Sequence, residues 1–574
     1  MDSKHIRLQF PSAFRTILTD LFRPARQPVL GWPAILGLTA LGLVLCAVPD
    51  LSLAQVPSST GSNHASAAAQ GIPAEHEGML EILHEDSASG SRYSYFLHAR
   101  NGRRYTLHFT GDRPEHLLTG AEIRVKGLEV GDTLALGGGG TTVQQPAPAP
   151  NALGEQRTLV ILVNFSDAPA EPYTRDDART VMFGTTSQFY LENSFQQTWL
   201  AGDVVGWFTI AATSTTCDTA GIAAQAQSAA SGAGVNLAAY AHHVYAFPQN
   251  YACYFWGRST VGGNPSQAWI NGDFELGVTA HEFGHGLGLW HSHSTDCGVT
   301  TLGSTCTVYE YGDTLDMMGA SSFAHFNAFQ KERLGWLNYG VSPPIRTVQT
   351  SGTYTLETYE LPGSGPKALK ILKSTDPSTG KRTWYYVQSR QAAGFDAGLV
   401  DNPNVLNGVL IHSGTEANGN SSQLFDMTPE SGTSIYLDWR DPALAVGQSF
   451  TDPVAGVTIT TDWVTGTAAG VTVRLASTGS TGTVTVTTDQ PSYTLNQSVS
   501  IKATARSGGS PVAKVPVTFT VKKPTGAVIT ATVTTGTNGT AVYKLRLKQQ
   551  DPVGIYEADA AAVSATAATN FTVR

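Results

Sequence analysis

A single stretch of this 574-residue chain limits its fold more than any other, and it covers residues 273–291. It reads D-F-E-L-G-V-T-A-H-E-F-G-H-G-L-G-L-W-H, with apolar residues and histidines recurring at helical spacing. Asp273 is expected to cap the resulting helix. Apolar residues follow two of its faces, so the helix is predicted to be buried, with His281 and His285 pointing from one side of it into an interior.

The same stretch predicts a catalytic metal centre. His281 and His285 are one helical turn apart, so both imidazoles can bind one tetrahedral ion, while Glu282 flanks that ion without ligating it. Gly288 is expected to let the chain turn back after the helix, which brings His291 in as the third ligand. Three histidines leave the fourth zinc position open for water, and an open position distinguishes a catalytic zinc site from a structural one. The alternative is that these are core histidines with a coincidental spacing. It would require all five positions of the pattern, the three histidines, Glu282 and Gly288, to match by chance.

The pattern H-E-x-x-H-x-x-G-x-x-H resembles that of the metzincin zinc endopeptidases. Residues 311–319, Y-G-D-T-L-D-M-M-G, resemble the Met-turn of that group, with Met318 as the expected methionine. Residues 310–319 together with F-N-A-F-Q-K-E-R-L-G-W at 326–336 more narrowly resemble the gametolysin family. Met318 could instead be ordinary packing in an irregular core. Asp316 is either a carboxylate that braces a ligand imidazole or an ordinary turn residue.

The resemblance implies an α+β zincin catalytic domain that hydrolyses peptide bonds of extracellular proteins, such as matrix or cell-wall glycoproteins. It implies one catalytic Zn²⁺, held by His281, His285 and His291, with Glu282 as general base for the attacking water. In the wider group the substrate extends along an edge strand, and residues 266–270 are our candidate for that strand. Two other functions stay open: a zinc-binding adhesin or glycan-binding protein with a degenerate protease core, and a zinc hydrolase acting on a non-peptide bond.

Shifts in composition divide the chain into segments, which the apolar patterns then classify. With 14% charged residues, 59 Gly and 29 Pro, the chain is expected to be rich in β-structure outside the catalytic segment. We predict a signal peptide at 1–54, disorder at 55–78, an N-terminal β domain and candidate pro-domain at 79–136, a Gly/Pro-rich linker at 137–156, a metzincin-like zinc peptidase domain at 157–340, a β-rich domain at 341–476 and an immunoglobulin-like β-sandwich at 477–574.

The N-terminus predicts a secreted protein. Five Lys and Arg residues precede an almost wholly apolar run at 29–48, as in an export signal, although an uncleaved run would act as a membrane anchor. After signal cleavage we expect no membrane association. The net charge of -9 gives no support for a nucleic-acid partner, so a protein or peptide substrate is expected. No D-x-D-x-D-G loop occurs, and calcium binding and the oligomeric state stay open.

Four cysteines remain after the predicted signal, all within about ninety residues, and an even number in an exported chain predicts two disulfides. Four cysteines allow three pairings, and proximity favours Cys217 with Cys253 and Cys297 with Cys306. Thiolate ligation of zinc is the alternative, but the sequence holds no C-x-x-C spacing.

If the protein is made as an inactive precursor, a side chain other than cysteine must block the metal, because no cysteine lies between residues 55 and 156. Phe109-Thr-Gly-Asp112 matches the F-x-G-D with which astacin-like precursors place an aspartate on the metal. We favour an ordinary hairpin turn for these four residues, since Gly-Asp pairs are frequent in β-turns.

Overall fold

The computed structural model describes residues 71–574, except 88–89, 112, 114–116, 322, 433–434, 477–481, 508 and 564. The predicted signal peptide, most of the predicted disordered segment and Asp112 lie outside the described residues. Within the described part, no helix is both long enough and apolar enough to cross a membrane.

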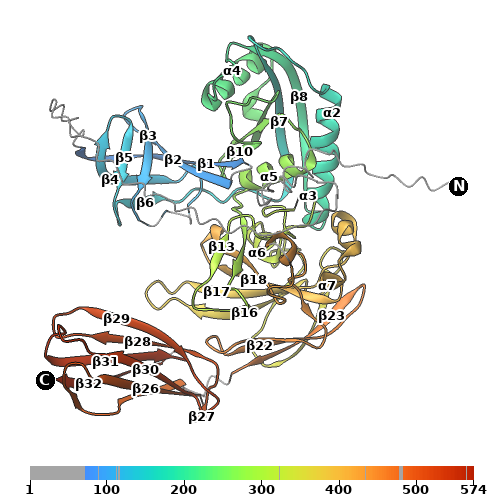
Figure 1. Ribbon diagram of the computed structural model, residues 1–574. Coiled ribbons are helices and arrows are strands. Elements are labelled where there is room, and N and C mark those ends of the chain that lie inside the picture. The colour runs from blue at the N-terminus through green and yellow to red at the C-terminus, as the bar shows by residue number, and fades with distance from the viewer. Residues whose placement is uncertain are drawn as a thin grey trace, which may run out of the picture.

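The first sheet runs from the N-terminal residues into the predicted peptidase segment (Figure 1). Its strands are Ile72–Ser87 (β1), Gly90–Ala99 (β2), Arg104–Phe109 (β3), Glu122–Val130 (β4), Thr133–Leu136 (β5), Thr141–Gln145 (β6), Gly154–Phe165 (β7), Thr198–Ile210 (β8), His242–Phe247 (β9), Gly257–Thr260 (β10) and Ser266–Asn271 (β11). Their spatial order is β6-β4-β5-β3-β2-β1-β10-β11-β9-β7-β8. The N-terminal strands and the peptidase strands therefore form one continuous sheet, joined where β1 pairs with β10.

Helices cover both faces of the peptidase part of this sheet. The helical segments are Arg175–Arg179 (α2), Thr180–Thr186 (η1, π-helical), Ser187–Asn193 (α3), Thr219–Gly232 (α4), Leu237–Ala239 (η2) and Leu276–Gly286 (α5). Val160 and Leu162 of β7 pack toward α3 and α5, whereas Leu159 and Ile161 pack toward α4. Both faces of β7 are buried, which explains why residues 159–163, L-V-I-L-V, are all apolar.

A second unit of two sheets follows. Its elements are Ser292–Asp296 (β12), Thr307–Tyr309 (β13), Ala328–Arg333 (α6), Ile345–Thr347 (β14), Gly352–Glu357 (β15), Ala368–Thr375 (β16), Arg382–Gln388 (β17), Gly394–Asp401 (η3), Pro403–Leu406 (α7), Gly408–Thr415 (β18), Gly419–Ser421 (η4), Ser422–Phe425 (β19), Ile435–Asp438 (α8), Leu444–Ala445 (β20), Ser449–Asp452 (β21), Val457–Val464 (β22) and Ala468–Leu475 (β23). One sheet has the order β13-β12-β19-β18-β17-β16-β14, with β20 paired to β18, and the other β15-β23-β22-β21. A shared apolar core includes Leu369 and Tyr385 of the first sheet and Ile459 and Val471 of the second.

The C-terminal residues form two further sheets, drawn in red in Figure 1. Their strands are Gly482–Thr488 (β24), Ser492–Tyr493 (β25), Ser498–Ser507 (β26), Ser510–Pro511 (β27), Pro516–Lys522 (β28), Val528–Thr534 (β29), Thr540–Arg546 (β30), Gly554–Ala562 (β31) and Ala565–Val573 (β32). Alternate residues of β26 and β28, such as Ile501 and Phe519, meet in one apolar core. The prediction of an immunoglobulin-like fold for these strands stays a prediction.

Three expected boundaries differ from the structure. Residues 72–78 were expected to be disordered, but they form the first part of β1 and pair with β4. Residues 141–145, expected within a flexible linker, form β6 at the sheet's outer edge. The chain also does not divide at residue 340, because β12 and β13 share a sheet with β16 to β19. In each case long-range strand pairing overrides a local Gly- and Pro-rich composition.

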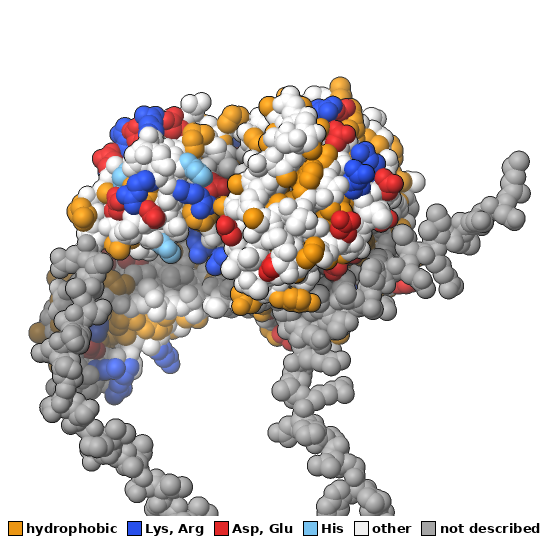
Figure 2. Space-filling view, turned by 90° about the horizontal axis from the view of Figure 1, so that it is seen from above, with side chains coloured by type: hydrophobic (Ala, Val, Ile, Leu, Met, Phe, Trp, Pro, Cys, Tyr) orange, Lys and Arg blue, Asp and Glu red, His pale blue; other side chains and the backbone are white. Residues whose placement is uncertain are grey.

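Charged side chains gather on the outer surface of the N-terminal lobe, as the left side of Figure 2 shows; Figure 1 draws this lobe in blue. Ion pairs between strands account for many of them, including Arg124 with Glu77, Arg104 with Glu81 and Arg103 with Asp132. Exposed pairs of this kind contribute little stability, so the core around Tyr105 and Ile123 holds this lobe together.

Candidate metal centre

Helix α5 presents His281 and His285 from one side, and both side chains are buried. The helix begins at Leu276, with Glu275 at the N-cap position and no side-chain capping bond. The expectation that Asp273 caps the helix was therefore wrong, because the chain becomes helical two residues later than the acidic residue suggested. The one-turn spacing of the histidines is unaffected by this shift.

After α5 the chain turns back at Gly288, whose φ is +88°. The Gly288 N–H donates to the carbonyl of His285 at 2.8 Å, and the Leu289 N–H donates to that of Gly284 at 3.0 Å. Residues other than glycine rarely adopt this backbone conformation. The turn returns His291 to the same side of the helix as His281 and His285.

Each of the three histidines is fixed through its Nδ1 atom. Nδ1 of His281 lies 2.7 Å from the carbonyl of Met317, and Nδ1 of His285 lies 2.9 Å from the carbonyl of Leu289. Nδ1 of His291 lies 2.9 Å from the Glu310 carboxylate. Since carbonyl and carboxylate oxygens only accept, each Nδ1 carries the proton, and each Nε2 is left with a free lone pair.

The three Nε2 atoms converge at a spacing that fits one zinc ion. Nε2 of His281 and Nε2 of His291 are 3.2 Å apart. Two ligands at zinc–nitrogen distances of about 2.0–2.1 Å in tetrahedral geometry are about 3.3 Å apart. Nε2 of His285 is buried and has no hydrogen-bond partner among the described residues. A buried polar atom without a partner is costly unless a ligand satisfies it, so the site fits a metal ion.

Glu282 lies beside the three histidines and is 1% exposed. Its Oε2 accepts a short hydrogen bond from the Ser259 hydroxyl on β10, while Oε1 has no partner among the described residues. Burial, together with the negative charge of Asp86, raises the pKa of Glu282 well above its usual value. The hydrogen bond at Oε2 thus holds the carboxylate in place, and Oε1 is available to accept a proton or a hydrogen bond.

The predicted Met-turn lies under α5. A Cβ atom added to Gly284 would come within 2.5 Å of the Met318 sulfur, so this glycine lets the helix approach the turn closely. Asp316 accepts the Met318 N–H at 2.7 Å and the Asn327 N–H at 2.5 Å. Its contacts therefore hold the turn and the start of α6, which supports the turn interpretation of this carboxylate over that of an imidazole brace. Burial raises the pKa of Asp316 to about 7.

Four residues of this centre were not predicted from the sequence. Asp86 of β1 lies within 3.6 Å of all three histidines, and the His84 ring packs against the rings of His285 and His291; all of these side chains are buried. Glu310 orients His291, and the Tyr311 ring lies 4.3 Å from the His291 ring, measured between centroids. Glu310 and Tyr311 belong to the segment that carries the family resemblance, which could have drawn attention to them. The H-E-D sequence at 84–86 follows no recognised metal motif, and only strand pairing brings it to the site.

The expected substrate strand was also wrong. Residues 266–270 lie in β11, which pairs with β10 on one side and β9 on the other, so β11 is not an edge. The edge strands of the peptidase part of the sheet are β10 and β8.

Both favoured disulfide pairings match the structure. Cys217 pairs with Cys253, and Cys297 pairs with Cys306. The second bridge closes the loop between β12 and β13, and so it lies between His291 and Glu310 in the chain.

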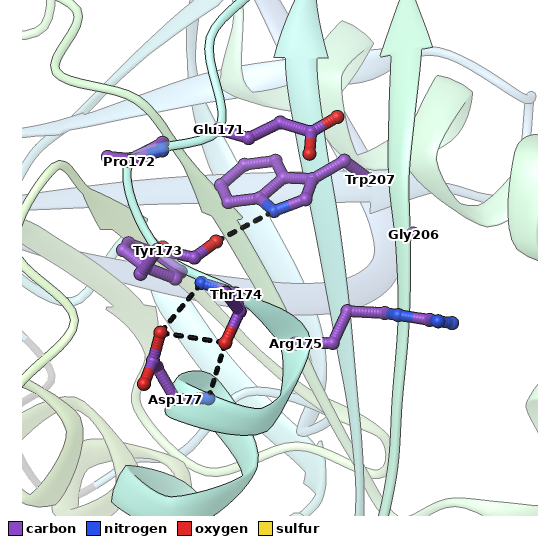
Figure 3. Close-up of a pocket in the computed structure, with 8 residues that line it drawn as sticks. All are labelled: Glu171, Pro172, Tyr173, Thr174, Arg175, Asp177, Gly206 and Trp207. Carbon is purple, nitrogen blue, oxygen red and sulfur yellow. Dashed lines mark hydrogen bonds between the residues drawn. The ribbon is translucent and has the colours of Figure 1, made fainter.

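A surface pocket of about 650 Å³ lies near the start of α2 (Figure 3). Thr174 and Asp177 form a reciprocal capping box at its base, and the Trp207 indole donates to the carbonyl of Tyr173 at 3.0 Å. These polar groups satisfy one another, and none of the metal-site histidines lines the pocket. It is therefore not part of the metal centre.

Comparison with known proteins gives one family. Residues 157–429 match the family model described as Gametolysin peptidase M11, and no curated protein matches. Among solved structures, an alkylpurine DNA glycosylase from Pseudomonas fluorescens is 13% identical over 17% of this chain and 31% of its own, with a TM-score of 0.14. A DUF4785 family protein from Legionella pneumophila is 15% identical over 19% of this chain and 32% of its own, with a TM-score of 0.15.

At these TM-scores the structural matches carry no argument, and the chain spans less than a third of either protein. The family match is different in kind. It starts within β7, ends just after β19, and includes all three converging histidines together with the turn at Met318. Through residues 157–429, the chain belongs to the gametolysin family of metallopeptidases.

Proposed function

We propose that the protein is a secreted zinc endopeptidase that hydrolyses peptide bonds of extracellular proteins. The observation that carries this proposal is the convergence of three Nε2 lone pairs, each fixed by a bond at Nδ1, beside a buried glutamate. Export rests on the predicted signal peptide. Matrix or cell-wall glycoproteins are the substrate class implied by the family resemblance.

In this proposal His281, His285 and His291 hold the zinc ion through Nε2. Bound zinc would supply Lewis acidity, which acidifies a water molecule and polarises the carbonyl under attack. Proton transfer and stabilisation of the oxyanion are assigned to side chains of the protein.

Glu282 is the general base in this mechanism. Ser259 holds Oε2, so Oε1 is the atom that takes the proton from the attacking water and later passes it to the leaving amine. A base adjacent to a metal ligand in the helix has no use in a purely structural site, which favours a peptidase over an adhesin.

Tyr311 is the group we assign to the oxyanion. Its hydroxyl donates to Oδ1 of Asp86 at 2.5 Å, and that oxygen lies 3.0 Å from Nε2 of His291. The hydroxyl therefore already serves a negatively charged oxygen beside the ligands. A substrate carbonyl oxygen that took this place would receive the same hydrogen bond as charge developed on it.

The test is Glu282→Gln, which removes the base and leaves the ligands. We expect zinc content to be unchanged and casein cleavage to fall by at least about 10²-fold, within the range of general acid–base catalysis. Glu275→Gln is the matched control, since Glu275 lies at the start of the same helix and makes no side-chain cap bond. Zinc content and turnover are measured on the same sample, after removal of the candidate pro-domain at residues 79–136. Turnover within tenfold of wild type in the Glu282→Gln variant would refute the assignment, as would cleavage that survives a chelator.

A further inference from the structure

We propose that residues 72–145 form an inhibitory domain that supplies Asp86 as a fourth ligand of the metal and lays β1 along the substrate-binding edge, β10. This inference rests on the proposed function and concerns its regulation. The aspartate assigned to the metal here is Asp86. The F-x-G-D motif pointed to Asp112 for this role, and Asp112 lies outside the described residues.

The first observation is the position of the Asp86 carboxylate. Oδ1 lies 3.0 Å from Nε2 of His291 and 3.5 Å from Nε2 of His281, and Oδ2 lies 3.6 Å from Nε2 of His285. These separations are close to the spacing of about 3.3 Å between ligands of one tetrahedral zinc ion. The carboxylate therefore stands where the fourth ligand belongs, which is the place of the catalytic water.

The carboxylate is also held firmly in that place. The side chain is fully buried, His84 Nδ1 lies 3.0 Å from Oδ2, and the Tyr311 hydroxyl donates to Oδ1. The His84 ring packs against the rings of His285 and His291 at centroid distances of 4.4 and 4.2 Å. With β1 in this position, water has no open coordination site to occupy.

The second observation is the pairing of β1 with β10. The strands are antiparallel, with Leu83 opposite Thr260 and Asp86 opposite Gly257. A Cβ atom at Gly257 would lie 1.8 Å from Oε1 of Glu282, so this part of β10 runs directly beside the base. A residue opposite Gly257 on any strand added to β10 would therefore face the base and the metal.

An extended peptide substrate gains its main-chain hydrogen bonds by adding to a sheet edge. Of the two edges of the peptidase part of the sheet, β8 and β10, β10 is the one that runs beside Glu282, and β1 already covers it. The N-terminal domain thus blocks both the metal and the strand on which a substrate would lie.

The closed state must be reversible if the protein is a peptidase. Four protein ligands are typical of structural zinc sites, whereas catalytic sites keep one position open. Glu282 has a function only when Asp86 withdraws. The segment that joins the two parts contains exposed residues at 144–146, 148–149 and 151, so a protease can reach the connection.

The test uses the chain from residue 55 onward, loaded with Co²⁺ for spectroscopy and with Zn²⁺ for turnover. Asp86→Ala is compared with Asp132→Ala, an exposed aspartate of the same domain. We expect Asp86→Ala to change the visible Co²⁺ bands and to raise peptide cleavage at least tenfold, and Asp132→Ala to change neither. A third form carries a specific protease site inserted after Pro146, and it is cut after folding and then separated from the N-terminal piece.

An unchanged Co²⁺ spectrum in folded Asp86→Ala would overturn the ligand assignment. A wild-type chain that cleaves peptides as fast as both Asp86→Ala and the cut form would overturn the inhibition. If Asp86→Ala does not fold, the cut form decides, because release of β1 must change the same Co²⁺ bands. A changed spectrum with no cleavage in any form would support the fourth ligand while refuting the peptidase function on which the inhibition rests.

Discussion

Replacement of Glu310 by Gln tests how the third histidine of the metal centre is oriented. Glu310 Oε1 lies 2.9 Å from Nδ1 of His291, and the carboxylate also lies 3.4 Å from Nε2 of His293. Burial acts to raise the pKa of Glu310, but the bonds to His291 and His293 hold it well below the usual range, so the group is ionised at neutral pH. The substitution removes the charge and keeps nearly the same shape.

The expected size of the effect follows from this one contact. A partner that holds a ligand histidine through its second nitrogen typically contributes 10- to 100-fold in metal affinity, or about 1.4–2.7 kcal/mol. Since Glu310 side-chain exposure is 35%, solvent screens part of the charge, and we expect the lower half of that range. The contacts of His281 and His285 are to backbone carbonyls and are unchanged.

The assay is a zinc titration of metal-free protein against a chromophoric chelator. Glu192→Gln is the matched control, because Glu192 makes a similar 2.8 Å contact with His325, which is not a metal ligand. We expect zinc affinity to fall about 10- to 30-fold in Glu310→Gln and to stay at the wild-type level in Glu192→Gln. An affinity within about twofold of wild type in Glu310→Gln would refute the view that this carboxylate orients His291.

The same geometry makes three other outcomes measurable. Tyr311→Phe should lower kcat by about 10²- to 10³-fold in protein freed of residues 72–145, with zinc content unchanged, and a loss under about threefold would exclude an oxyanion role. Replacing Cys297 and Cys306 together by Ala should weaken zinc binding at temperatures where the domain is still folded, because the loop they close joins His291 to Glu310. Chelator titration measures the zinc affinity, and thermal unfolding measures the stability of the domain. Burial lowers the pKa of His242 from 6.5 to about 4, so the unfolded chain binds the proton at a higher pH than the folded chain does. The free energy of unfolding should therefore fall by up to about 3 kcal/mol as the pH drops from 6.5 to 4. His242→Gln should make the free energy of unfolding less dependent on pH in this range, and an unchanged slope would contradict this.

The sequence alone was enough to define the local part of the metal centre. Two histidines four residues apart share a helix face whatever surrounds the helix, and Gly288 marks a turn because few other residues adopt its φ. The disulfide pairings were also accessible, since cysteines close in sequence are close in space in most folds. The histidine pair and the glycine turn each span only a few residues, and the two disulfides span 36 and 9 residues, so periodicity and spacing contain the information.

The tertiary structure alone decided which other groups join that centre. Asp86 is 195 residues from His281 in the chain and reaches it only because β1 pairs with β10, a contact that leaves no periodic signal in either segment. Glu310 reaches His291 only once β12 and β13 have paired across the disulfide loop. The interior position of β11 likewise depends on its pairing with β9 and β10. Strand pairing between remote segments is set by packing of the whole sheet, and for that reason the fourth group at the metal could not be read from the residues that surround it in the chain.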